Sequence, residues 1–454
     1  MKSIGTLLVA FASAGLAAAG CSGRPEAPTK NVLLITLDGA RQDHLSAFGY
    51  SRRTTPNIDW LAANGVAFRN VVPTGCSTLP SLTSLFTSRG WAGSQIDRRS
   101  VLRESNVTLA ETFAAAGYDT AGFVASPVLA AETRFGQGFA VYEDFRDVPV
   151  RYVTAERPVH AAIRYLQSRD TARPIFLYLH LEEPHPPWRQ DSPWLDGEER
   201  SQSFFGEGCT YVPTADELAQ LDDRTKANLV AKYDGALRYA DEQIGYLLEH
   251  LRTSGMLANT AVAVSTDHGL ELVDRYSATH GYNPFDEVVR TFLILYDQST
   301  SFVGVAPEQV QARIFDIGPT LMALARVDKP PTAEGVDLLS RGAVVPEYAF
   351  TKCYNADIVR TLDYKLINVD FSRARRNGDH LPVGLREGRH LYALRTDPGE
   401  KNDIAGRNPR IEAAMENARV TRGSAQPEPK PADGSQPVTM DPIVEERLRV
   451  LGYE

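Results

Sequence analysis

The 454-residue sequence has only four cysteines, no excess of positive charge and, beyond its N-terminal segment, no apolar run long enough to span a membrane. The cysteine spacing is not that of a zinc ribbon. Lysine and arginine number 48 against 57 aspartates and glutamates, and the net charge of −9 argues against a general surface for nucleic acids or anionic membranes. A local anion site built from metal ions would not show in this total.

The N-terminal segment has the pattern of an exported protein. Small and apolar residues fill positions 4–17, a length typical of a signal peptide and too short to span a bilayer securely. The segment ends in AAGC, which resembles the bacterial lipobox, whose cysteine becomes the lipid-modified first residue of the mature chain. We expect a lipoprotein signal peptide at residues 1–20, lipidation at Cys21 and a tether at residues 21–30. The alternative is an ordinary cleaved signal with a chance cysteine.

Ser22 resembles the signal that sorts lipoproteins to the outer membrane, so we expect a lipid-anchored protein of the bacterial cell envelope that faces the periplasm or the cell surface. In this oxidising compartment Cys76, Cys209 and Cys353 allow one disulfide and leave one free thiol. The sequence leaves the pairing open.

Helical and strand-like segments alternate along residues 31–340. Continuous apolar runs are typical of strands buried on both faces of a parallel sheet, and they occur at residues 31–38, 121–126, 174–182, 261–267 and 291–297. Helical patterns occur at residues 55–64, 108–116, 159–168, 224–254 and 314–325, the last with an expected kink at Gly318-Pro319. The pattern predicts an α/β domain with a central, mostly parallel sheet flanked by helices.

The pattern changes after Pro330-Pro331. Short alternating runs at residues 348–354, 364–370 and 390–395 predict a small antiparallel sheet within a subdomain at residues 341–405. Residues 406–454 form the predicted tail, with a flexible linker at 422–442 and a short terminal helix at 443–451.

Two predicted strands end in groups that bind metals. Asp38 follows the first strand and Asp267-His268 follow a later one, at the carboxyl edge where open α/β sheets place their ligands. Carboxylate and imidazole together suit zinc, manganese or similar ions. A lone strand-end aspartate can instead be a turn or cap residue.

A loop runs into a predicted helix at Thr78-Leu79-Pro80. A helix start is electropositive, so a hydroxyl held there beside a metal could attack a phosphate or sulfate ester. The alternative is that Thr78 only caps the helix and that Cys76 is only a small buried residue.

Glu182 and His185 follow the strand at 174–182, and His280 precedes Gly281. These side chains could bind a second metal, and the histidines could also stabilise non-bridging oxygens or protonate a leaving group. Structural histidines are the alternative. Trp188 and Trp194 could stack on a sugar or aryl group, or could serve as packing anchors.

These segments together resemble the sulfatase family of the alkaline phosphatase superfamily over nearly the whole chain. The resemblance rests on LITLDGARQDHLSAFGY, TTPNIDWLAANGVAFRNV, TLPSLTSLFTS, DHG, HG followed by DEVVR, LYALRTDPGEKND and the closing LRVLGYE. It implies an alkaline-phosphatase-like fold and an ester hydrolase. It further implies that Asp38, Asp267 and His268 ligate metal, that Thr78 stands at the nucleophile position, and that His185 and His280 line the site.

The sequence departs from the family at two places. Formylglycine sulfatases have Cys or Ser at the nucleophile, Pro or Ala two positions on and Arg four positions on, where this chain has Thr78, Pro80 and Leu82. Cys76 does not fit this pattern, and threonine cannot become formylglycine. Gly39 replaces the second of two calcium-binding aspartates, a form similar to the nucleotide pyrophosphatase and phosphodiesterase branch, which uses threonine beside two zinc ions.

In that branch an aspartate stands three residues before a histidine after the middle strand, and here Glu182 and His185 take those places. Glutamate could substitute with a longer reach. The resemblance therefore implies one or two divalent ions, zinc first and manganese or calcium as alternatives, with Glu182 and His280 as additional candidate ligands.

The leading hypothesis is a metal-dependent hydrolase of phosphate mono- or diesters that acts through a covalent Thr78 intermediate. The alternatives are sulfuric ester hydrolysis without formylglycine, periplasmic phosphoryl transfer to an envelope sugar or lipid, and a non-catalytic binding lipoprotein. We expect a small-molecule, glycan or lipid ester as substrate, a membrane contact through the lipid anchor, and no nucleic-acid partner. The sequence does not identify the substrate.

Overall fold

The computed structural model describes residues 30–90, 102–148, 153–170, 172–188, 190–197, 220–275, 279–342, 344–372, 375 and 385–425. The predicted signal peptide, Cys21, most of the tether, Cys209 and the predicted terminal helix lie outside these ranges. Within the described ranges, no helix combines the length and the apolar character that crossing a membrane requires.

The core of the molecule is an eight-stranded sheet with the strand order β4-β3-β5-β1-β6-β7-β2-β8. The strands are β1 (Asn31–Leu37), β2 (Val66–Val72), β3 (Asp119–Val124), β4 (Val141–Glu143), β5 (Ile175–Leu181), β6 (Thr260–Thr266), β7 (Thr291–Tyr296) and β8 (Ala312–Arg313). Only β7 runs antiparallel to both its neighbours, β6 and β2. The predicted mostly parallel sheet is confirmed, whereas the strand β2 and the short strands β4 and β8 were not predicted.

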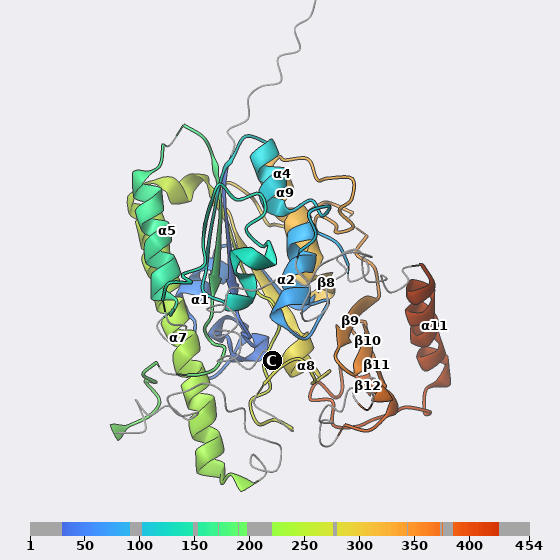
Figure 1. Cartoon of the computed structure of the whole chain (residues 1–454). Helices are drawn as coiled ribbons and strands as arrows, with labels where there is room; N and C mark the ends of the chain where they lie inside the picture. The colour runs from blue at the N-terminus through green and yellow to red at the C-terminus, as the bar shows by residue number, and fades with distance from the viewer. Residues whose placement is uncertain are drawn as a thin grey trace, which may run out of the picture.

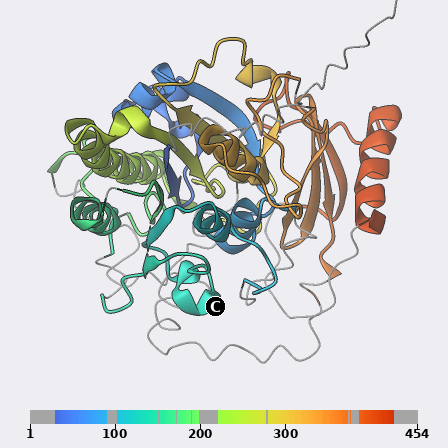
Figure 2. The same cartoon turned by 90° about the horizontal axis from the view of Figure 1, so that it is seen from above.

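Helices cover both faces of this sheet, as Figures 1 and 2 show. One face carries α1 (Pro56–Ala63), α5 (Glu156–Ser168) and α7 (Asp223–Thr253), and the other carries α2 (Thr78–Thr87), α4 (Leu109–Ala115) and α9 (Ile317–Ala325). A short helix, α8 (Asp286–Val289), precedes β7.

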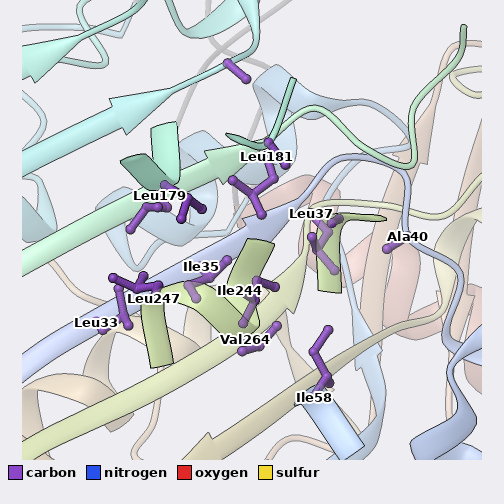
Figure 3. Close-up of a cluster of buried hydrophobic side chains, with 14 of the residues drawn as sticks. Leu33, Ile35, Leu37, Ala40, Ile58, Leu179, Leu181, Ile244, Leu247 and Val264 are labelled. Carbon is purple, nitrogen blue, oxygen red and sulfur yellow. The ribbon is translucent and has the colours of Figure 1, made fainter. Parts of the chain in front are cut away.

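Successive side chains of β1 point to opposite faces, so the strand contributes to two cores. Leu33, Ile35 and Leu37 pack with Ile244 and Leu247 of α7 in the first core, which Figure 3 shows. The alternate residues of β1, Val32 and Leu34, belong to the second core. Burial on both faces explains why the strand is a continuous apolar run.

The kink predicted at Gly318-Pro319 is wrong. Ile314–Asp316 form a 3-10 turn and α9 begins at Ile317, so Pro319 lies in its first turn. The first four backbone N–H groups of a helix have no acceptor within it, and a proline there therefore costs no hydrogen bond.

A separate antiparallel sheet with the order β12-β11-β10-β9 confirms the predicted small sheet. Its strands are β9 (Ala349–Cys353), β10 (Ala356–Arg360), β11 (Tyr364–Val369) and β12 (Gly388–Ala393), of which β10 was not predicted. Met415 of α11 (Pro409–Ala425) packs on this sheet, at the right of Figures 1 and 2. Because α11 ends at Ala425, the predicted linker does not begin at residue 422.

Candidate active site

Polar side chains from three adjacent strands meet at the carboxyl edge of the main sheet. Asp38, Glu182 and Asp267 directly follow β1, β5 and β6, which lie side by side in the order β5-β1-β6. The Asp38 backbone N–H donates to the Leu181 carbonyl at 2.9 Å, which continues the β1–β5 pairing past the end of β1. The strand order therefore gathers carboxylates that are far apart in the sequence.

Thr78 is the first residue of α2 and faces this group. Its buried Oγ1 lies 3.2 Å from Asp38 Oδ2, to which it can donate, and 3.2 Å from His268 Nε2. The N-cap of α2 is Ser77, which makes no side-chain cap hydrogen bond. The interpretation of Thr78 as only a helix cap is therefore wrong.

The Asp267-His268 pair is held by the backbone. Asp267 Oδ1 accepts from the N–H groups of Gly39 at 3.2 Å and His268 at 2.9 Å. His268 Nδ1 lies 2.8 Å from the Gly269 carbonyl, which can only accept, so Nδ1 carries the proton. In the neutral ring Nε2 then has a free lone pair, and it lies 3.4 Å from Asp267 Oδ2 and 3.6 Å from Asp38 Oδ1.

Asp38 and Asp267 are buried, and little positive charge lies near their carboxylates. Burial, and next the charge of Asp267, raise the pKa of Asp38 well above its ordinary value, against the lowering influence of His268 and Thr78. Asp38 Oδ1 and Asp267 Oδ2 are buried without a hydrogen-bond partner among the described residues. Ligand atoms of Asp38, Asp267 and His268 all lie within 4.8 Å of one another. Two carboxylates and one imidazole lone pair in this arrangement fit a divalent cation.

His180 of β5 also belongs to the site, although the sequence interpretation missed it. Its Nε2 lies 3.3 Å from Asp38 Oδ2, and its Nδ1 lies 2.8 Å from Thr36 Oγ1. Asp38, His180 and Glu182 form a second group whose ligand atoms lie within 4.8 Å of one another. The only sequence signal was one ionisable residue inside an otherwise apolar strand.

His185 and His280 lie beside His268 at the edge of the cluster. His185 Nδ1 lies 2.7 Å from the Pro186 carbonyl, and its Nε2 lies 3.1 Å from His280 Nε2. The His280 ring is 4.3 Å from the His268 ring. Burial lowers the pKa of His185 to about 4. Two groups of described residues have the spacing of metal ligands, and His280 belongs to neither. Its position therefore favours a role beside the metal ligands.

Strand β9 of the small sheet is bonded to the loop before Thr78. Cys76 forms a disulfide with Cys353, with a Cα–Cα distance of 5.1 Å. The Lys352 N–H donates to the Thr74 carbonyl at 3.0 Å, and the Tyr354 N–H donates to the Gly281 carbonyl at 3.1 Å. The disulfide removes Cys76 as a nucleophile, and the same strand end supports the loops of Thr78 and His280.

The two loop tryptophans differ in environment. Trp188 is 1% exposed, and its indole N–H donates to the Pro184 carbonyl at 2.7 Å. It is therefore a packing anchor. Trp194 is half-buried, and the guanidinium carbon of Arg52 lies 5.6 Å from its ring centre.

Comparisons with known proteins found a matching family profile, together with relatives and solved structures that resemble this chain. The sequence profile named Sulfatase matches residues 30–327. N-acetylglucosamine-6-O-sulfatase of Bacteroides thetaiotaomicron is 21% identical, with 88% of this chain and 87% of that protein covered. Among solved structures, one bound to its substrate D-glucosamine-2-N,6-O-disulfate has a TM-score of 0.69 at 17% identity, covering 91% of this chain and 100% of the other. Phosphonate monoester hydrolase of Agrobacterium radiobacter has a TM-score of 0.64 at 17% identity, with the same coverage.

Proposed function

The chain belongs to the sulfatase family of ester hydrolases, within the alkaline phosphatase superfamily, and on this premise we propose that it cleaves phosphate mono- or diesters through a covalent bond to Thr78. The observation that carries the proposal is the buried Thr78 hydroxyl, 3.2 Å from both Asp38 and His268. Threonine has a secondary alcohol, which cannot be oxidised to an aldehyde, so the formylglycine route of related sulfatases is closed here. A hydroxyl nucleophile that forms and then loses a phosphoryl ester is the chemistry that fits.

Enzymes of this family use a divalent metal, and Asp38, Asp267 and His268 are the residues that would hold it. Such an ion, with zinc first and manganese or calcium as alternatives, would activate the Thr78 hydroxyl and neutralise ester oxygens. The Thr78 oxygen attacks phosphorus, and its hydrogen passes toward the Asp38 carboxylate to which it already donates. The start of α2 adds positive potential beside the same oxygen.

The leaving group departs with help from His185 and His280. The Nε2 atoms of His185 and His280 lie 3.1 Å apart, so one proton can sit between them and pass to the leaving oxygen. Water then attacks the phosphorus atom and releases Thr78. The outcome is hydrolysis in two steps, each with Thr78 as attacking or leaving group.

The second candidate is hydrolysis of sulfate esters by the unmodified threonine. The named relatives favour it, because one is a sulfatase and one solved structure contains a sulfated sugar. The phosphonate monoester hydrolase favours phosphorus chemistry on the same fold. The substrate class that we propose, a small-molecule, glycan or lipid ester, covers both candidates.

A matched panel of 4-nitrophenyl phosphate, bis(4-nitrophenyl) phosphate, 4-nitrophenyl phenylphosphonate and 4-nitrophenyl sulfate tests the proposal on the zinc-loaded protein. We expect a higher kcat/KM on a phosphorus ester than on the sulfate. Thr78→Ala should lower kcat by at least about 10³-fold. Thr83→Ala is the matched control, because Thr83 lies on the same helix and its hydroxyl makes no hydrogen bond among the described residues. Unchanged turnover in Thr78→Ala overturns the nucleophile, and a preference for sulfate overturns the phosphate assignment.

We also propose that the protein is lipid-anchored in the cell envelope through Cys21. The support is the apolar segment at residues 4–17 followed by AAGC. Cys21→Ser should move the protein from the membrane fraction to the soluble periplasmic fraction. Retention of that variant in the membrane overturns the anchor.

A further inference from the structure

We propose that Tyr233 of α7 and Thr266 at the end of β6 are positioning residues for the metal ligand Asp267, and that they act through the backbone of Gly39. The inference rests on the proposed function and deepens it, because Asp267 is one of the residues that would hold the metal. It assigns a role to two buried hydroxyls that the proposed reaction does not otherwise use.

The Tyr233 hydroxyl makes two hydrogen bonds to the turn that follows β1. It donates to the Gly39 carbonyl at 3.0 Å and accepts from the Arg41 backbone N–H at 2.7 Å. A phenol hydroxyl has one hydrogen to donate, so Gly39 receives it. The side chain is fully buried, and its polar atom is therefore directed at the backbone directly after Asp38.

The peptide group between Gly39 and Ala40 is held from both sides. Its carbonyl accepts from Tyr233, and its N–H donates to Thr266 Oγ1 at 3.0 Å. The carbonyl and N–H of a trans peptide point in opposite directions, so α7 holds one side of this group and the end of β6 holds the other. Thr266 Oγ1 also lies 2.7 Å from the His268 carbonyl, which ties the same peptide to the segment of Asp267.

Gly39 requires this support because its own conformation is permissive. Its φ of +69° lies in the left-handed region, which glycine enters at little cost, so the residue itself does not fix the direction of its N–H. That N–H donates to Asp267 Oδ1 at 3.2 Å, and Asp267 Oδ2 lies 3.4 Å from His268 Nε2. The held peptide therefore keeps Gly39 in the conformation that turns Oδ2 of Asp267 toward the other ligand.

The ring of Tyr233 is fixed by contacts that do not involve its hydroxyl. Its centre lies 5.2 Å from the His44 ring and 5.9 Å from the Trp188 ring, both in edge-to-face arrangements. Tyr233→Phe keeps the atoms that make these contacts and removes only the hydroxyl. The substitution therefore isolates the two hydrogen bonds to the turn.

The test is the zinc affinity of the chelator-stripped protein, measured by competition with a chromophoric chelator. Loss of an outer hydrogen bond that orients a metal ligand weakens metal binding by about 10-fold or more, and we expect about 10-fold for Tyr233→Phe. Tyr239→Phe is the matched control, because it lies on the same helix and loses a hydroxyl that is 3.2 Å from Thr154 Oγ1. Its zinc affinity should equal that of the parent.

A double-mutant cycle separates positioning from a general loss of stability. In Asp267→Ala the Gly39 N–H has no carboxylate to orient, so adding Tyr233→Phe should change zinc affinity by less than about 2-fold. A loss of about 10-fold in both backgrounds overturns the role. A lower thermal midpoint of stripped Tyr233→Phe with the zinc affinity of the parent also overturns it.

A second pair of variants tests the other side of the same peptide, and circular dichroism of each stripped variant should match that of the parent. Thr266→Ala removes the hydroxyl and should weaken zinc binding, whereas Thr266→Ser keeps it and should not. Equal affinities in this pair overturn the inference, even where Tyr233→Phe does not fold.

The outcomes for the positioning role and for the proposed function are separate. Zinc affinity at the parent value in Tyr233→Phe, with turnover that still depends on Thr78, overturns the positioning role and leaves the proposed function intact. Weaker zinc binding in Tyr233→Phe, with turnover indifferent to Thr78→Ala, supports the positioning role and overturns the proposed function.

Discussion

Among the described residues, two clusters of charged side chains that are largely removed from water are built in opposite ways. In the ion-pair cluster, where α8 meets the small sheet, Asp286 accepts from Arg360 at 2.9 Å and from Lys365 at 2.8 Å. Lys365 also lies 2.5 Å from Glu400. Two carboxylates thus face two cations. At the carboxyl edge of the main sheet, the ion-pair partners of Asp38 within the described ranges are the histidines His180 and His268.

The difference appears in how the two aspartates titrate. Burial tends to raise the pKa of Asp286, but the charges of Arg360 and Lys365 outweigh it and hold that pKa well below the ordinary value. Burial and Asp267 instead raise the pKa of Asp38. Asp38 is fully buried and the Asp286 side chain is 10% exposed, so both carboxylates are largely removed from water and the neighbouring charges decide the direction. The ion-pair cluster finds its counter-charges within the chain, whereas the cluster around Asp38 presents a ligand set that fits a divalent cation.

The largest expected effect comes from neutralising a carboxylate of the cluster around Asp38. Asp267→Asn should lower kcat/KM by at least about 10³-fold and reduce zinc binding. In the stripped protein its thermal midpoint should equal or exceed that of the parent, because the change removes an uncompensated buried charge. The new amide can still accept from Gly39 and His268. A much less stable stripped variant would contradict the comparison.

The same change in the ion-pair cluster should lower stability and leave zinc binding unchanged. Asp286→Asn leaves Arg360 and Lys365 without their main counter-charge, so we expect a loss of about 3–5 kcal/mol in the free energy of unfolding. Urea denaturation measures this loss, and zinc content should stay at the parent value in the folded variant. Loss of zinc with unchanged stability would show that the ion-pair cluster supports metal binding and not stability, which contradicts the comparison.

A disulfide links the two regions, because Cys76 lies two residues before Thr78 and Cys353 ends β9. Cys353→Ala should cost about 2–4 kcal/mol of stability under oxidising conditions. Cys209→Ala controls for the loss of a thiol. Equal denaturation midpoints for the two variants would show that the bond does not form in solution.

The smallest expected effect concerns Glu183, which lies next to the cluster around Asp38. Burial raises the pKa of Glu183 from about 4.5 to about 8, so folding favours its protonated form. Its contribution to stability is therefore full below pH 4.5 and is lost as pH rises toward 8, by about 1.4 kcal/mol per pH unit at most. Glu183→Gln should flatten the pH dependence of the unfolding free energy over this range. An identical dependence in the variant would show that Glu183 stays ionised.

Much of this architecture could be predicted because strand ends carry local signals. Asp38 and Asp267-His268 each end an apolar run, and parallel strands bring such ends to one edge. His180 could not be selected, because it lies inside an apolar run and only the pairing of β1 with β5 places it opposite Thr36. The pairing of Cys76 with Cys353 depends on contacts across 277 residues, for which the sequence has no local signal.

Strand direction and very short strands were also beyond prediction. β7 reads as another buried strand, and its apolar pattern is the same whether its neighbours run parallel or antiparallel. β4 has three residues and β8 has two, which is too short for any periodicity to develop.

Identification of the residue that carries the covalent intermediate tests the role of Thr78 most directly. The zinc-loaded protein is mixed with bis(4-nitrophenyl) phosphate, quenched in acid during turnover and analysed by peptide mass spectrometry. We expect a 4-nitrophenyl phosphate ester on Thr78 in the parent and in Thr83→Ala, because attack expels only one of the two nitrophenolates, and no such adduct in Thr78→Ala. An adduct on a different residue, or turnover by Thr78→Ala at the parent rate, would contradict that role.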